Sequence, residues 1–272
     1  MARLLSQRLI ERLKNGDFKN ILLSINQDSE LSLEIRLSSI AMIYYKKSKI
    51  LTLHSRKQEP TILADGYCTL HSKPILNLDN PSEYFKNAKK IVDEHVKKKK
   101  NIEFAIQQKI SADNNSNMNH YLVVDMEYQF AQQLIKERTT KKTRFDLVAI
   151  DLQNNKIILF ELKQGFASST GTSGVHDHII KYQEHFNHSV FRSALISDIK
   201  SIIEQKEELG IYQFPTNFIL ENLANASIVF KVIFAFNNSK EKDIYKNKYG
   251  NNNETLFIDI SDSKYIIKND NI

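Results

Sequence analysis

Apolar and polar positions divide the first part of the chain into one helix and a set of short strands. Apolar residues recur at helical spacing over residues 4–14, which predicts a helix that ends at Asn15. Residues 31–38 then alternate between apolar and polar, as a half-buried strand does. Two apolar segments within 40–54 flank a lysine-rich tip and predict a hairpin. Residues 1–80 are therefore expected to form a small α+β region.

The remaining residues, 81–272, predict a second and larger domain. Helical patterns cover 82–110, a segment starting near 174, and 191–209, whereas strand patterns cover 121–130, 144–152, 156–163, 227–236 and 255–260. The order helix, three strands, helix, strand favours an α/β sandwich with a mixed sheet.

Composition narrows the classes of protein that this chain can represent. With 272 residues, 41% of them hydrophobic, the chain has enough apolar surface for a sizeable core. The single cysteine, Cys68, can form neither an internal disulfide nor a multi-cysteine zinc site. No segment approaches the ~18 consecutive apolar residues typical of a membrane span. We therefore expect a cytoplasmic protein that does not enter the membrane.

Glycine and charge narrow the function further. The seven glycines form neither of the two common glycine-rich loops that cradle nucleotide phosphates, so a kinase, a P-loop ATPase or a standard dinucleotide dehydrogenase is disfavoured. The net charge of +6 is a mild indication of an anionic partner.

The most informative segment is the predicted hairpin 144–165. If Asn154 and Asn155 form a two-residue turn, paired residues have numbers that add to 309, so Asp146 faces Lys163. Residues two apart on a strand share a face, so Glu161 projects to the same side. Diagonal neighbours lie roughly 7–8 Å apart at the backbone, which lets the two carboxylates converge on one ion.

The surroundings of these charges are largely apolar. Both faces of the hairpin carry mostly hydrophobic side chains, as strands in the middle of a covered sheet do. Charges at the edge of such an environment are costly unless they are paired or bind a metal. The alternative to a metal site is an inert ionic cluster in which Glu161 and Lys163 neutralise each other.

Asp146, fourteen intervening residues and then Glu161-Leu162-Lys163 at the end of an apolar strand resemble the PD-(D/E)xK nuclease superfamily. The resemblance covers roughly residues 82–236, with Phe145 where the motif has proline. It implies an α/β (α+β mixed) domain with a restriction-endonuclease-like αβββαβ core and a mixed central sheet. It also implies a Mg²⁺-dependent nuclease that hydrolyses DNA phosphodiester bonds, with restriction or bacterial defence as its setting.

The resemblance also implies residue roles. Asp146 and Glu161 would hold one or two Mg²⁺ ions, for which Mn²⁺ can substitute, and Lys163 would position or activate the attacking water. The superfamily often adds a glutamate from the first core helix, and Glu103 is the choice because it falls on the apolar stripe of that helix. An ordinary solvated acid is the plainer interpretation of Glu103. The other candidates are Glu83, Glu94, Asp125 and Glu127.

Some members of the superfamily carry Gln-x-x-x-Tyr on the next helix, and here His178 and Tyr182 occupy those positions. Helical spacing places His178, Lys181 and Tyr182 on one face, where all three could donate to phosphate oxygens. The alternatives are a plain amphipathic helix and a zinc site built from His176, His178, His185 and His188.

Other segments add basic or flexible character near the predicted site. The glycine-dense loop 165–174 could contact a nucleic-acid backbone or serve as a linker. Lysine-rich clusters at 46–49, 97–100 and 141–144 are usually solvated, although the last leads directly into Asp146.

Three rival functions and the oligomeric state stay open. The rivals are a non-catalytic nucleic-acid-binding protein that retains the fold, a nuclease for RNA or branched DNA, and a structural protein with an ion pair. A homodimer is one assembly that the sequence allows.

Overall fold

The computed structural model describes residues 3–46, 48–62, 74–98, 103–115, 119–131, 134, 144–164, 175–212, 220–249 and 255–268. These residues form a mixed α/β structure with two sheets. The chain divides into two compact units: unit 1 comprises Met1–Gln108 and Ser201–Gln213, and unit 2 comprises Lys109–Lys200 and Phe214–Ile272. The domain boundary predicted near residue 80 falls inside unit 1.

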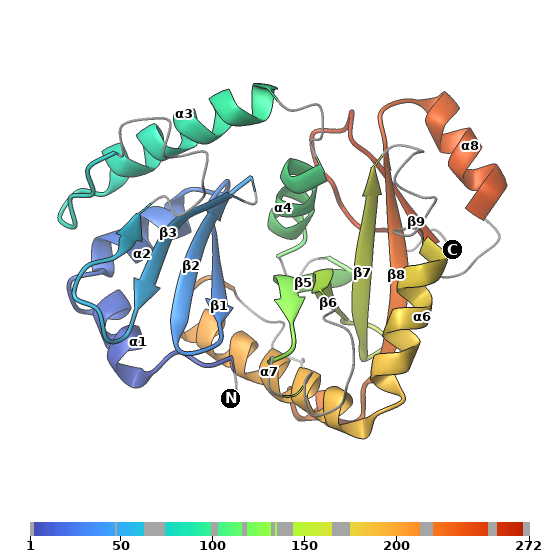
Figure 1. Cartoon of the computed structure of the whole chain (residues 1–272), viewed down its shortest axis with the longest axis horizontal. Helices are drawn as coiled ribbons and strands as arrows, with labels where there is room; N and C mark the ends of the chain where they lie inside the picture. The colour runs from blue at the N-terminus through green and yellow to red at the C-terminus, as the bar shows by residue number, and fades with distance from the viewer. Residues whose placement is uncertain are drawn as a thin grey trace. The chain divides into compact units, whose positions relative to one another are not determined.

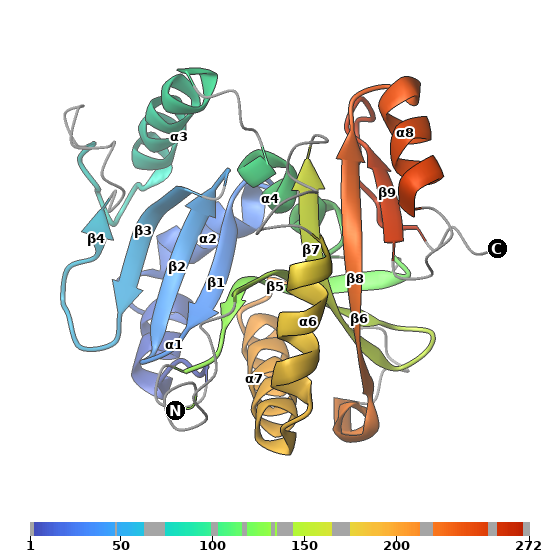
Figure 2. The same ribbon diagram turned by 45° about the vertical axis from the view of Figure 1, so that its right-hand side comes forward.

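Unit 1 contains helices around an antiparallel sheet of order β1-β2-β3-β4. Its elements are α1 (Gln7–Lys14), α2 (Lys19–Gln27), β1 (Ser32–Arg36), β2 (Ile40–Tyr45), β3 (Ser48–His54), β4 (Thr61–Ile62) and α3 (Ser82–Lys98). Side chains from the three helices and the first three strands share one hydrophobic core. Figure 2 shows α1 and α2 behind the strands.

The ends of α1 follow from local chemistry. The Ser6 side chain caps the helix by accepting a hydrogen bond from the backbone N–H of Leu9, so the helix begins at Gln7. It ends at Asn15, as predicted. A Cβ on the following Gly16 would lie 2.9 Å from the Cα of Arg12, so the chain needs glycine there.

Two helical expectations need correction. The helix predicted over 82–110 is two helices, because α3 ends at Lys98, within the lysine run that interrupts the apolar stripe, and α4 (Glu103–Asp113) begins afterwards. Helix α2 was not predicted, although its buried Ile21 and Ile25 have helical spacing.

Unit 2 is built on a mixed sheet of order β5-β6-β7-β8-β9. Its elements are β5 (Tyr121–Gln129), β6 (Arg144–Asp151), β7 (Lys156–Gln164), α6 (Val175–Phe186), α7 (Ser189–Glu208, shared by sequence with unit 1), η3 (Leu220–Asn225), β8 (Ser227–Phe236), α8 (Ser239–Tyr249) and β9 (Thr255–Asp259). The first three strands are antiparallel, and β7, β8 and β9 are parallel. The predicted strands and the mixed sheet are confirmed, whereas α8 was not predicted (Figure 1).

The hairpin of β6 and β7 has a different register from the one predicted. Asp151 pairs with Lys156, so partners add to 307 and the turn has four residues. The Asp151 carboxylate accepts hydrogen bonds from the backbone N–H groups of Gln153 and Asn154, at 3.1 and 2.9 Å, and this favours the longer turn. A shift of two residues preserves every face, so the predicted common face of Asp146, Glu161 and Lys163 survives the correction.

No helix within the described ranges combines the length and the apolar character that crossing a membrane requires.

Candidate active site

The candidate site begins where the ladder between β6 and β7 ends. The last backbone pair of that ladder is Leu147 with Phe160. One residue further on, the Asp146 carboxylate accepts a hydrogen bond at 2.9 Å from the backbone N–H of Leu162. Asp146 is buried, and this bond fixes its carboxylate next to the strand that carries Glu161 and Lys163.

Glu161 lies at the centre of the polar contacts. Its Oε1 accepts a hydrogen bond from the Lys163 ammonium at 2.8 Å and lies 3.2 Å from Nδ1 of His178. Its Oε2 accepts a hydrogen bond from the Tyr182 hydroxyl at 2.8 Å. The side chains of Glu161 and Lys163 are only 7% and 8% exposed, whereas His178 is 22% exposed and lies toward solvent.

These contacts set the protonation states. Burial alone would raise the pKa of Glu161, but the hydrogen bond from His178 and the charge of Lys163 lower it below its usual value. Glu161 is therefore ionised at neutral pH. Burial and the neighbouring Glu161 charge raise the pKa of Tyr182 far above its ordinary value, so its hydroxyl stays a proton donor.

Tyr182 occupies a different place from the one expected of a substrate contact. It is buried between aromatic rings, with its ring centroid 4.8 Å from that of Phe145 and 4.1 Å from that of Phe230. Helix α6, which carries it, contacts β8. Phe145, which stands where the nuclease motif has proline, thus forms part of the pocket that holds Tyr182 against Glu161.

A further acid shares this face of the sheet. Asp125 of β5 lies opposite Val148 of β6, after a bulge between Val123 and Asp125. Because paired residues share a face, Asp125 projects to the same side as Asp146 and is itself buried. Glu127 has a positive φ of 57° and pairs with Arg144 at 2.8 Å. The sequence named both acids as candidates, but it gave no sign of the bulge.

The remaining predicted site residues are not brought together with this group. Glu103 is the first residue of α4, half-buried, and belongs to unit 1, so its part as a metal ligand stays a prediction. The Lys181 side chain, the loop 165–174 and residues 141–143 lie outside the described residues.

The histidines of α6 have separate partners. His178 pairs with Glu161, whereas the buried His185 packs against aromatic rings, 4.9 Å from Phe191 and 5.9 Å from Phe130. In the part of the chain that the structure describes, no group of three or more His, Cys, Asp or Glu side chains could hold a metal ion.

The donor set that is present nevertheless fits one kind of ion. Asp146 and Glu161 supply hard carboxylate oxygens from neighbouring strands. Mg²⁺ is usually held by one or two carboxylates, while waters and phosphate oxygens complete its coordination. Two carboxylates beside a buried lysine therefore suit a Mg²⁺ ion that is shared with a phosphate substrate.

Comparison of the chain with protein-family models, curated proteins and solved structures returns no match.

Proposed function

We propose that unit 2 is a Mg²⁺-dependent nuclease that hydrolyses DNA phosphodiester bonds on a restriction-endonuclease-like core. The observation that carries this proposal is the buried group of Asp146, Glu161 and Lys163 on one face of the central hairpin. The topology supports it, since three antiparallel strands, a helix and a parallel strand follow in the order of an αβββαβ core.

The balance of charge favours a metal site over a simple ion pair. Asp125, Asp146 and Glu161 project from one face, and Lys163 is the only lysine or arginine on that face among the described residues of β7. An excess of carboxylates is costly in a buried setting unless a cation joins them. A divalent ion meets that need, and a phosphodiester is the substrate that such an ion can share.

Each residue then has a defined part in the reaction. Asp146 and Glu161 would hold Mg²⁺, with Tyr182 and the Leu162 amide fixing the two carboxylates. When bound, the ion lowers the pKa of water and offsets charge that builds on the phosphate. The Lys163 ammonium adds a fixed positive charge beside that phosphate and stabilises the transition state.

A cleavage assay with matched lysine variants tests the proposal. The full chain is incubated in Mg²⁺ or EDTA with linear, circular, single-stranded and branched DNA, and with RNA. We expect Mg²⁺-dependent DNA cleavage that Lys163→Ala reduces about 10²–10³-fold, as removal of one transition-state donor typically does. Lys156→Ala, at the other end of β7, should leave the rate unchanged because Lys156 lies at the turn.

Several results would contradict this function. Equal cleavage by wild type and Lys163→Ala, or cleavage that persists in EDTA, would remove the assigned site. Binding of DNA without cleavage in either Mg²⁺ or Mn²⁺ would favour the non-catalytic binding protein. Cleavage of RNA alone would change the substrate class while keeping the site.

A further inference from the structure

Unit 1 contains a pocket of about 730 Å³ that is lined by residues outside the candidate active site. Its walls come from the start of α1, the turn between β1 and β2, and the segment that follows β3. Pockets of roughly 300–1,000 Å³ are typical of small-molecule sites. The chemistry of the walls indicates which class of molecule fits.

Hydroxyl groups are the first feature of these walls. Ser38 and Ser55 line the pocket, and their hydroxyls bond to no residue that the structure describes. The Ser6 and Ser39 hydroxyls lie 3.1 Å apart and share a hydrogen bond, while the Ser39 oxygen also accepts from the Ser6 backbone N–H at 2.7 Å. Only one of the two hydroxyl protons is used between them, so the second can be donated to a ligand.

Positive charge is the second feature. Arg56 and Lys57 line the pocket, and neither side chain has a hydrogen bond or ion pair with a described residue. The lining includes no acid. The acid that α1 contacts nearby, Asp17, is engaged by the Arg12 guanidinium at 2.8 and 2.5 Å. The pocket therefore favours an anion.

The wall that carries these cations is held in place. Arg12 donates to the backbone carbonyls of Lys57 at 2.7 Å, Gln58 at 2.8 Å and His54 at 3.3 Å. The Arg12 guanidinium also lies 3.8 Å from the ring centroid of Phe18. A fixed wall lowers the ordering cost of binding, because the backbone that presents Arg56 and Lys57 is already in position.

We propose that this pocket binds a small organic phosphate of nucleotide size. The phosphate group lies among Arg56, Lys57 and the serine hydroxyls, because cations and hydroxyl donors match phosphate oxygens. The organic part lies against Leu4 and Leu5, of which Leu4 is 48% exposed although it is a large apolar residue. This binding is independent of the nuclease activity proposed for unit 2.

Calorimetric titration of the full chain in EDTA tests the proposal, with AMP, adenosine and inorganic phosphate as probes. We expect AMP to bind at least tenfold more tightly than adenosine, because each charge-assisted hydrogen bond to phosphate is worth about a factor of ten. The double variant Arg56→Gln, Lys57→Gln should weaken AMP binding at least tenfold. Lys19→Gln, which removes an exposed cation elsewhere in unit 1, should not weaken it.

Further arms separate this pocket from other phosphate sites. Lys163→Ala should leave AMP binding unchanged, whereas loss of binding there and not in the double variant would place AMP in unit 2 and overturn the proposal. Duplex DNA should not displace AMP, and displacement would instead assign the cations to nucleic-acid binding. Absence of AMP binding, or equal binding of adenosine, would also overturn it. Circular dichroism of the double variant checks that the fold is retained.

Discussion

Two buried glutamate–lysine pairs, one in each unit, show how a structural ion pair differs from a candidate active site. In unit 1, Lys206 donates to Glu34 at 2.9 Å, and the two side chains are 2% and 1% exposed. In unit 2, Lys163 donates to Glu161 at 2.8 Å with a similar degree of burial. The pair distances alone do not distinguish them.

The neighbours of each pair carry the difference. Around Glu34, Ser32 donates to the carboxylate at 2.6 Å and Lys206 also donates to the Tyr212 hydroxyl at 2.9 Å. The partners of Glu161 include the half-buried His178, and a second carboxylate, Asp146, is fixed on the adjacent strand. An additional carboxylate and a side that faces solvent are thus the features that suit chemistry, and the unit 1 pair has neither among these contacts.

The largest expected effect breaks the unit 1 pair. Lys206→Met should lower the free energy of unfolding by about 3–5 kcal/mol, because it leaves the Glu34 charge buried without its partner. Urea denaturation of the full chain measures this loss. Replacing both residues, with Glu34→Leu added, should recover most of it. A double variant as unstable as Lys206→Met would show that the pair itself does not explain the loss.

The second prediction compares two buried tyrosines of unit 2. Tyr182 donates to Glu161 at 2.8 Å, and Tyr128 donates to Asp198 at 2.9 Å. Either Tyr→Phe change should cost about 1.5–3 kcal/mol of stability, since each removes a hydrogen bond to a charged group. Tyr182→Phe alone should also lower DNA cleavage about tenfold or more, because it frees a proposed metal ligand. Equal cleavage by the two variants would reduce Tyr182 to a packing role.

The two pairs also show what the sequence could and could not predict. Asp146, Glu161 and Lys163 lie on one apolar hairpin, where alternation fixes a common face even when the register is wrong by two residues. The Asp151 carboxylate that lengthens the turn acts locally, so an Asp followed by two asparagines was a usable signal. Glu34 and Lys206 are 172 positions apart, and no local pattern links them.

The same reasoning explains the other omissions within unit 2. The bulge that places Asp125 opposite Val148 depends on how β5 pairs with β6, so periodicity along β5 alone does not reveal it. Tyr182 was recognised by its helical spacing from His178, but spacing cannot tell a phosphate contact from a buried donor to Glu161. The aromatic packing against Phe145 and Phe230 decides that point.

The third prediction concerns acid stability. The pKa of Glu161 is lowered in the folded chain by His178 and Lys163 despite burial, so an unfolded chain takes up this proton at a higher pH than the folded one does. The pair therefore contributes stability above the ordinary pKa of about 4.5 and loses it as pH falls below that value. Urea denaturation in EDTA should show a steeper acid loss for wild type than for Glu161→Gln, by up to about 1.4 kcal/mol per pH unit. Parallel curves would contradict the assignment.

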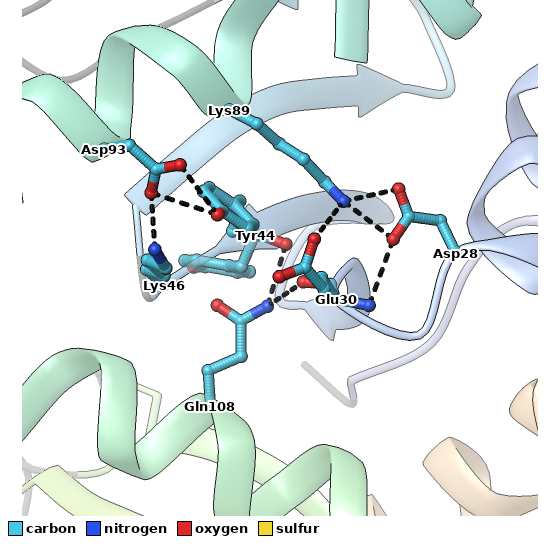
Figure 3. Close-up of polar contacts among 8 residues, drawn as sticks. Asp28, Glu30, Tyr44, Lys46, Lys89, Asp93 and Gln108 are labelled. Carbon is cyan, nitrogen blue, oxygen red and sulfur yellow. Dashed lines mark hydrogen bonds and ion pairs between the residues drawn. The ribbon is translucent and has the colours of Figure 1, made fainter. Parts of the chain in front are cut away.

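The smallest effects belong to the more exposed pairs of unit 1 that Figure 3 shows. Lys46 contacts Asp93 with both side chains about one-third exposed, at 33% and 35%, whereas Lys89 is 16% exposed and contacts both Asp28 and Glu30. Water screens the first pair, so Lys46→Met should cost about 0.2–1 kcal/mol. Lys89→Met should cost more than Lys46→Met and less than Lys206→Met.

Urea denaturation of these three variants in one buffer tests whether burial sets the scale. Each variant removes a lysine of unit 1 that pairs with at least one acid, so the principal difference between them is the exposure of the pair. Raising the salt concentration should shrink the Lys46→Met effect and leave the Lys206→Met effect nearly unchanged, because salt screens exposed charges far more than buried ones. If Lys46→Met proved as destabilising as Lys206→Met, the buried pair of unit 1 would be no stronger than a surface pair. The contrast with Glu161 and Lys163 would then have to rest on Asp146 alone.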